Sequence, residues 1–148
     1  MINNRRTLQT KAPIKDMLNT KLSAHNVSYG LSEGGYDIRI KQEVNLSSVL
    51  RFTIASTIEE FDMPMDLLGV VHDKSSWARR GLSVFNTVIE PGWKGFLTLE
   101  LVYHGPGVLC IPASAGIAQV VFHQVTDRTA YSGKYQNQED RPVEAIAS

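Results

Sequence analysis

A series of short apolar segments, separated by glycine and proline turns, is the feature that most constrains how this chain folds. Turn signals such as "EPGW", "HGPG" and "PASAG" separate several of these segments. Many short strands at close spacing predict a β-sandwich or β-barrel rather than repeated βαβ units. The strands are expected at residues 49–55, 67–72, 82–89, 95–103, 107–111 and 117–125.

The N-terminal part predicts one helix and one further strand. Residues 12–24 place Pro13 where a first helical turn tolerates it. Residues 36–41 alternate apolar and polar side chains, as a strand with one solvated face does. The fold is therefore expected to be mainly β with one short N-terminal helix. The apolar side chains at helical spacing are Ile14, Met17, Leu18 and Leu22.

Length and charge predict a single soluble domain, residues 1–148. A chain of this size buries roughly 70% of its unfolded surface. Lysine plus arginine and aspartate plus glutamate both number 15, so no net charge draws the molecule to nucleic acid or to an anionic membrane. The N-terminus lacks the apolar stretch of a signal peptide, and no later run approaches the ~18 apolar residues of a membrane span. We expect a cytoplasmic protein that binds neither nucleic acid nor membrane.

Cysteine and histidine usage gives no sign of a zinc site. The single cysteine, Cys110, excludes an internal disulfide and a multi-cysteine zinc site, which suits a reducing, intracellular setting. It lies in the apolar segment "VLCI" and is expected to be a core thiol. The four histidines are scattered without a metal-like HxxxH pair. No residue of the chain is therefore predicted to bind a metal directly.

The stretch "DKSSWARRG", which begins at Asp73, supports two interpretations. As a structural element it is a short helix, capped by Asp73 or Ser75 at its start and by a glycine at its end. As a site, its free backbone amides and hydroxyls, with Lys74 and Arg79 nearby, are what a phosphate group prefers. The stretch alone does not decide between the two.

The strand "GFLTLELVYH" brings one carboxylate into an apolar setting. Period-two alternation places Thr98 and Glu100 on one face. The other face carries Leu97, Leu99 and Leu101. A solvated glutamate at a sheet edge is the simpler interpretation. If a partner subunit covers that face instead, desolvation raises the pKa of Glu100 and suits it to general-base chemistry near neutral pH.

Two further segments flank this strand. In "IEPGWKG", Pro91 and Gly92 fit the second and third positions of a tight turn, whereas the role of Glu90 stays open. From residue 127 the chain is polar without a periodic apolar face, so its composition predicts a mobile tail. The tail also suits a lid that orders on an anionic ligand, through Tyr131, Lys134, Tyr135 and Gln138.

Four motifs in order resemble the dCTP deaminase branch of the dCTP deaminase/dUTPase superfamily: "KSSWARRGL", "IEPGWKGFLTLEL", "GIAQVVF" and "YSGKYQNQ". The first two are specific as a pair, and the last is specific to the deaminase branch. The resemblance implies a distorted β jelly roll or barrel of the dUTPase-like type. It also implies a homotrimer with active sites at the subunit interfaces, and a nucleotide of the dCTP or dUTP type bound with Mg²⁺.

The resemblance assigns phosphate binding to three segments of the chain. The family's "RSS" element corresponds to Lys74, Ser75 and Ser76, with lysine where arginine is usual. Lysine keeps the charge but loses the bidentate fork. The family's following arginine corresponds to Arg79. The C-terminal lid over the triphosphate, about residues 127–148, carries Lys134, Tyr135 and Gln138.

By the same resemblance, Glu100 is the glutamate that activates water in the deamination of dCTP to dUTP and ammonia, which supplies deoxyuridine nucleotides for dTTP synthesis. Zinc-dependent deaminases carry H-x-E and P-C-x-x-C signatures, which are absent here. A zinc-free enzyme needs a carboxylate as its base, with Ser75 and Arg79 positioning the water, the pyrimidine or the phosphates. The hairpin that reads the pyrimidine edge contains Asn86, Thr87 and Glu90.

Three alternatives remain open at this stage. In a dUTP diphosphatase, water attacks the α-phosphate and a hairpin aspartate is catalytic; Glu90 stands at that position, with one methylene more. A bifunctional enzyme would convert dCTP to dUMP and pyrophosphate. The hairpin at residues 84–91 is slightly shorter than in typical deaminases, so the identity of the base it reads is open. The "IAQ" of the third motif is closer to the form found in dUTPases. A nucleotide-binding regulator with weak catalysis is therefore the third alternative, although the retention of Glu100 favours catalysis.

Overall fold

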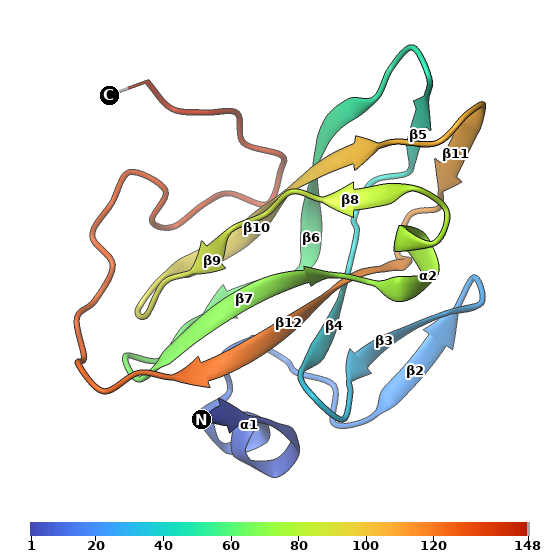
Figure 1. The fold of residues 1–148 in the computed structure, drawn as a ribbon. Coiled ribbons are helices and arrows are strands. Elements are labelled where there is room, and N and C mark those ends of the chain that lie inside the picture. The colour runs from blue at the N-terminus through green and yellow to red at the C-terminus, as the bar shows by residue number, and fades with distance from the viewer. Residues whose placement is uncertain (148) are drawn as a thin grey trace.

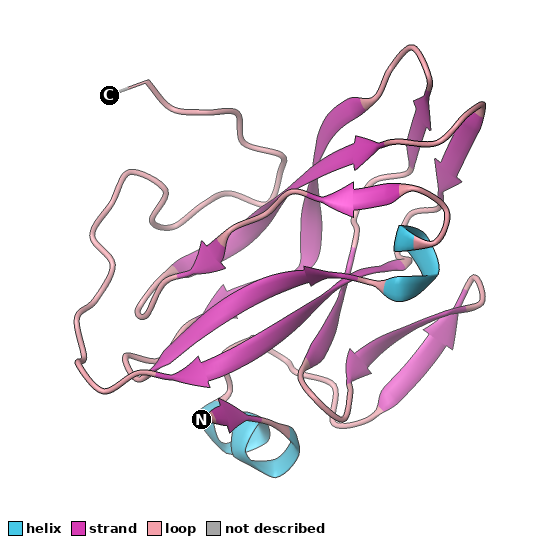
Figure 2. Ribbon diagram, viewed as in Figure 1, coloured by secondary structure: helices cyan, strands magenta, loops and turns pink. Residues whose placement is uncertain are grey.

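The computed structural model describes residues 1–147, and strands dominate them (Figures 1 and 2). Two short helices accompany the strands of this part of the chain, and neither is long and apolar enough to cross a bilayer. In chain order the elements are β1 (Ile2–Asn3), α1 (Arg5–Lys11), β2 (Lys21–Ala24), β3 (Val27–Leu31), β4 (Tyr36–Arg39), β5 (Val44–Ser47), β6 (Phe52–Asp62), β7 (Leu67–Asp73), α2 (Ser75–Ala78), β8 (Leu82–Val84), β9 (Val88–Ile89), β10 (Lys94–Tyr103), β11 (Val108–Ile111) and β12 (Gly116–Gln124).

The strands form one larger sheet and two small ones. The larger sheet has the order β2-β3-β4-β12-β7-β9, and β1 adds to β12. A three-stranded sheet has the order β6-β10-β8, and β11 pairs with β5. Side chains from the larger sheet and from the three-stranded sheet share one core. It includes the fully buried Ile38, Phe61, Leu99, Leu101 and Phe122. The expectation of a mainly β fold is confirmed.

The helix expected at residues 12–24 is wrong. The N-terminal helix is α1 instead, and it ends at Ala12 in a left-handed conformation with φ of 46°. The segment that follows pairs with β6, where Lys15 donates its backbone N–H to the Glu60 carbonyl (2.9 Å). Ile14 is buried in the core without belonging to a helix. Tertiary packing of an irregular segment therefore explains the apolar spacing.

The expected strands are confirmed at β7, β10, β11 and β12, each within one residue of its expected bounds. β6 begins later than expected and runs on to Asp62, and the strand expected at residues 82–89 is divided into β8 and β9. The sequence patterns do not predict β1, β2, β3 and β5, which are short.

Two side chains lie where the sequence does not predict them. Asp37 of β4, on the face expected to be solvated, is buried and accepts hydrogen bonds from Lys74 Nζ (2.7 Å) and Ser28 Oγ (3.1 Å). Cys110 is exposed, so its expected place in the core is wrong. Alternation along β11 buries Leu109, on the opposite face, instead.

Gly116 tests how closely the larger sheet is packed. A Cβ added here would lie 2.0 Å from the Ser28 carbonyl oxygen, so Gly116→Ala must displace β3 from β12. We expect the unfolding free energy to fall by about 2–4 kcal/mol, measured by urea denaturation. The control is Gly34→Ala, because a Cβ there has no neighbour within 4 Å. That variant should stay within about 0.5 kcal/mol of the parent, and an equal loss in both variants would contradict the close packing.

Candidate active site

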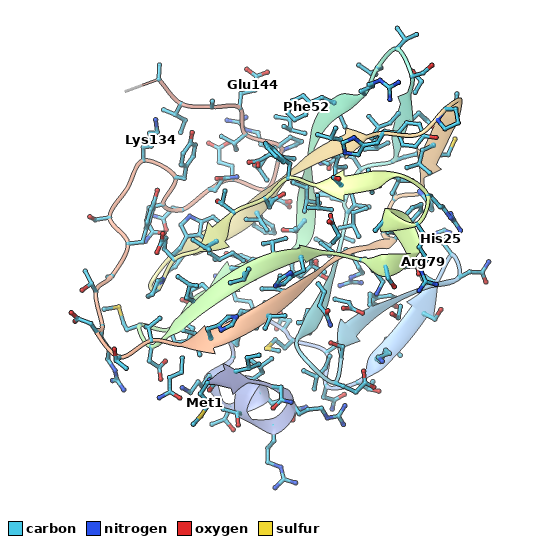
Figure 3. All side chains as sticks on the ribbon, viewed as in Figure 1. Met1, His25, Phe52, Arg79, Lys134 and Glu144 are labelled. Carbon is cyan, nitrogen blue, oxygen red and sulfur yellow. The ribbon has the colours of Figure 1, made fainter. Side chains whose placement is uncertain are left out.

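An open cavity of about 1030 Å³ lies beside β10. Its walls come from β6, from β10, from residues 85–90 and from the C-terminal tail. Figure 3 shows Phe52 of β6 and Glu144 of the tail on the same side of the molecule, and both line the cavity. The volume is that of a small-molecule site.

Glu100 is half-buried in this cavity. As alternation predicts, Leu99 and Leu101 are fully buried in the core, while Thr98 and Glu100 line the cavity. Burial, with no opposing charge or hydrogen bond from residues 1–147, raises the pKa of the Glu100 carboxyl above its ordinary value. Such a carboxylate is suited to exchange a proton with a bound ligand or water.

The alternation is broken one step earlier along β10. The register between β10 and β6 shifts between Phe96 and Thr98. At this point Leu97 donates its N–H to the Thr57 hydroxyl (3.1 Å). Leu97 is half-buried and packs against the core, as expected, and it also lines the cavity beside Thr98. The cavity gains an apolar wall next to its carboxylate.

Asn86 holds the loop between β8 and β9 against β10. Its side-chain N–H donates to the Thr98 carbonyl (2.7 Å), and its side-chain oxygen accepts the Glu100 N–H (2.9 Å). These bonds take the place of a backbone ladder, which is why the strand expected at residues 82–89 is interrupted. They also fix the backbone of Glu100. Thr87 is exposed in the same loop and lines the cavity.

The turn after β9 has the expected geometry. Trp93 donates its N–H to the Glu90 carbonyl (3.1 Å), and Gly92 has a φ of 76°, as the third position requires. Glu90 is exposed and lines the cavity. Trp93 is buried, and its indole Nε1 donates to the Tyr135 carbonyl (2.7 Å). The turn thus also holds the tail.

The C-terminal tail is docked along β10, although its composition predicts mobility. Phe96 donates its N–H to the Gln138 carbonyl (3.0 Å), beside a short parallel bridge between the two segments. Tyr135 and Gln138 line the cavity. Lys134 is exposed, and its ammonium donates to the Ile146 carbonyl (2.5 Å). Tyr131 lines the cavity as well, so three of the four lid candidates reach it and Lys134 does not.

The short helix expected in "DKSSWARRG" is confirmed as α2, with a different cap. Lys74 is the N-cap residue, and no side chain caps the helix. The Asp73 carboxylate accepts the Val84 N–H instead (2.6 Å). The Lys74 ammonium is largely buried and paired with Asp37. Its charge is already balanced within the chain, so a contact between Lys74 and phosphate stays a prediction.

The other phosphate-binding candidates are exposed in and just after α2. Ser75, Ser76 and Arg79 are all solvent-exposed. None of them lines the cavity that contains Glu100. Figure 3 labels Arg79 and Lys134 on opposite sides of the view. A single chain therefore does not bring the two halves of the expected site together.

Thr98 and Trp93 are among the cavity residues that the sequence does not single out as site candidates. Alternation does place Thr98 on the Glu100 face, and this is the signal that could have singled it out. The hydroxyl of Thr98 contacts the tail, which no local pattern indicates. The contact joins segments about 40 positions apart.

Oxygen atoms are the ligands that the cavity offers to a metal ion. Glu90, Glu100 and Glu144 line it. Within residues 1–147, however, no three histidine, cysteine or carboxylate side chains are grouped to hold an ion.

Known sequences similar to this chain identify its family. A family model described as dCTP deaminase-like matches residues 38–125. The dCTP deaminase of Campylobacter jejuni (strain RM1221) is 38% identical, over 76% of this chain and 78% of that protein. The dCTP deaminase of Herpetosiphon aurantiacus is 34% identical, over 90% of this chain and 91% of that protein.

Solved structures show the same fold. The native EIAV dUTPase matches with a TM-score of 0.58 and 18% identity, over 84% of this chain and 94% of that one. A mutant dUTPase from phage phi11 of S. aureus, described with a structural Mg(II) ion, matches with a TM-score of 0.59 and 14% identity, over 81% and 92%. These structures confirm the dUTPase-like β fold expected from the sequence. Together with the matched region, which contains Glu100, the relatives show that the chain belongs to the dCTP deaminase-like family.

Proposed function

We propose that this protein is a dCTP deaminase that hydrolyses dCTP to dUTP and ammonia without zinc. The observation that carries the proposal is Glu100, a half-buried carboxylate with a raised pKa in a cavity of nucleotide size. The relatives at 38% and 34% identity are named dCTP deaminases. The product would supply deoxyuridine nucleotides for dTTP synthesis.

Glu100 acts alternately as base and acid. Its carboxylate takes a proton from water while the water oxygen attacks C4 of cytosine, and the proton passes to ring N3. The tetrahedral C4 then carries a hydroxyl and the amino group. A second proton moves from the hydroxyl through Glu100 to the amino group, the C4–N bond breaks, and ammonia leaves a C4 carbonyl. A raised pKa suits both directions, because the carboxyl must hold the proton between steps.

The loop after β8 is proposed to position the pyrimidine. Thr87 and Glu90 are exposed at the cavity and are free to contact the base or sugar. Asn86 uses its amide on the backbone of β10, so its part in substrate binding is to fix the loop. The apolar wall at Leu97 and Trp93 suits the face of the ring.

A neighbouring copy of the chain is proposed to complete the site, within a homotrimer. Ser75, Ser76 and Arg79 would reach the triphosphate from that copy, since they are exposed away from the Glu100 cavity. Two aromatic side chains at the cavity support a covered surface: Phe52 is 53% and Phe85 is 71% exposed. Exposed apolar groups of this size commonly mark an interface.

The tail and a divalent ion are proposed to share the triphosphate charge. Lys134, Tyr135 and Gln138 would contact the phosphates from a lid that comprises about residues 127–148, of which residue 148 lies outside the described part. Mg²⁺ would be held by the phosphate oxygens and would neutralise their charge. Lys74 would contribute through its position at the N-cap of α2, where its pairing with Asp37 fixes the start of the helix. We further propose that residues 1–148 work as one domain in the cytoplasm.

One observation favours testing a second activity. Glu90 and Glu100 line the same cavity, so a bifunctional enzyme that also releases pyrophosphate has both carboxylates available. Incubation with dCTP, dUTP and Mg²⁺, followed by product separation, separates the possibilities. We expect dUTP and ammonia from dCTP. Formation of dUMP and pyrophosphate from dUTP would indicate a diphosphatase, and tight binding without product would indicate a regulator.

Replacing the proposed base tests the assignment of Glu100. Glu100→Gln keeps the shape of the side chain but cannot accept the proton, so ammonia release should fall by at least about 10³-fold. Nucleotide affinity, measured by calorimetry, should stay largely intact. Glu43→Gln, at an exposed position outside the cavity, is the matched control. Near-normal turnover by Glu100→Gln would exclude this base.

The raised pKa of Glu100 also predicts how pH acts on rate and stability. The base form is required, so kcat should fall with decreasing pH in a range above the ordinary glutamate value of 4.5. Burial disfavours the ionised form of Glu100, so it lowers the free energy of unfolding at pH values above the folded-state pKa. At pH values well below 4.5 the carboxyl is protonated in the folded and unfolded states, and this cost is absent. Thermal denaturation should therefore show Glu100→Gln to be more stable than the parent at pH 8, with the gain vanishing towards pH 4. Destabilisation of the variant at pH 8 would contradict the claim that the Glu100 carboxylate has no charged or hydrogen-bonding partner within residues 1–147.

Mixing two inactive variants tests the shared site. Glu100→Gln and Arg79→Ala damage different halves, so mixed trimers should contain some sites with both intact residues. With random mixing in equal amounts after gentle dissociation, about a quarter of the sites should recover activity. Light scattering should give a trimer for each protein alone. A monomer, or no recovery in demonstrably mixed trimers, would contradict sharing.

A further inference from the structure

The hydroxyl of Thr98 joins three parts of the cavity wall. Thr98 lies two residues before Glu100 on β10, and both line the cavity. Its Oγ1 accepts a hydrogen bond from Gln138 Nε2 and another from the Val143 backbone N–H (3.1 Å). Its carbonyl accepts the amide of Asn86. The residue is 8% exposed, so these bonds are protected from water.

The two donors belong to different segments of the tail. Gln138 ends the part that runs beside β10, through the bond between its carbonyl and the Phe96 N–H. Val143 lies in the strap, the name used here for residues 139–147. Val143 and Glu144 of the strap line the cavity. One hydroxyl therefore holds two parts of the lid, the part that ends at Gln138 and the strap, to the strand that carries Glu100.

The other attachments of the strap are more exposed. Asp140 pairs with Lys41, but the two side chains are 45% and 41% exposed, and a surface pair of this kind contributes little. Ile146 donates its N–H to the Tyr135 hydroxyl (3.1 Å), which is a bond within the tail itself. The bond from Val143 to Thr98 is thus the strap's protected link to the sheet.

We propose that Thr98 is a positioning residue whose hydroxyl acts as a latch: it holds the lid, including the strap, over the Glu100 cavity. The effect on turnover rests on the proposed deaminase function, whereas the latch itself does not. A threonine oxygen has two lone pairs, which the two donors fill. Valine has nearly the same shape and cannot accept either bond, so the tail would dissociate more often from β10.

The latch predicts a split between binding and chemistry. If the nucleotide binds best when the tail is docked, apparent affinity falls with the docked fraction. Thr98→Val should raise KM for dCTP about tenfold. The rate constant kcat should stay within about threefold, because Glu100 keeps its own backbone clamp through Asn86. Thr98→Ser keeps the hydroxyl and should restore KM.

Amide hydrogen exchange tests the latch without any need for turnover. In Thr98→Val, amides of residues 134–146 should exchange about tenfold faster, while those of β12 stay unchanged. Thr98→Ser should exchange like the parent. Val143→Pro removes the donor from the other side, and it should free the strap alone if Thr98→Val fails to fold. The proposal would be overturned if amide exchange in the tail were unchanged in Thr98→Val, or in Val143→Pro where Thr98→Val does not fold. It would also be overturned if Thr98→Ser accelerated exchange in the tail as much as Thr98→Val does.

The two measurements separate the latch from the proposed function. Faster exchange in a protein that shows no deamination supports the latch and removes the proposed activity. Normal exchange in an active deaminase removes the latch alone. A fall in kcat at unchanged KM in Thr98→Val would also contradict it, because that pattern assigns the hydroxyl to the chemical step.

Discussion

The partial burial of one carboxylate, which has no partner within residues 1–147, is the constraint on which the site depends. Glu100 stands on a strand whose neighbouring residues, Leu99 and Leu101, anchor it in the core. Asn86 then fixes the Glu100 backbone from the other side. The fixed backbone directs the Glu100 side chain to the cavity face of β10, where partial burial raises the pKa of its carboxyl. In the proposed deamination, proton transfer at C4 would need that property, because the same group would take up and release a proton.

The serines of α2 and Arg79, which are the proposed phosphate-binding residues, lie outside the cavity that contains this carboxylate. The serines of α2 and Arg79 are exposed, whereas the Lys74 ammonium is held by Asp37 inside the chain. The proposed trimer would bring the two halves together without moving either of them within its own chain. The substitution of lysine for the usual arginine is compatible with the pairing, since one ammonium on one carboxylate needs no bidentate fork. In this structure the pair with Asp37 holds Lys74 at the start of α2, and its contact with phosphate stays a prediction.

The parts that sequence reasoning predicts are those governed by local rules. Alternation along β10 predicts the face of Glu100, and the turn at Pro91 and Gly92 follows from backbone preferences alone. The prediction of a helix at residues 12–24 is wrong because Ile14 is buried by pairing with β6 rather than by lying on the apolar face of a helix. The contacts of Asn86 and Thr98 join segments that are distant in sequence, so no local pattern contains them. For the same reason the polar composition of the tail predicts mobility, whereas contacts with distant residues dock it along β10.

The central claim is that water attacks C4 of the pyrimidine rather than a phosphorus atom. The most direct measurement is turnover of dCTP in ¹⁸O-labelled water, with the product analysed by mass spectrometry. Attack at C4 should give one ¹⁸O atom on the uracil ring of dUTP and one ammonia released for each label incorporated. Label found only in phosphate groups, with the amino group retained on the ring, would contradict it.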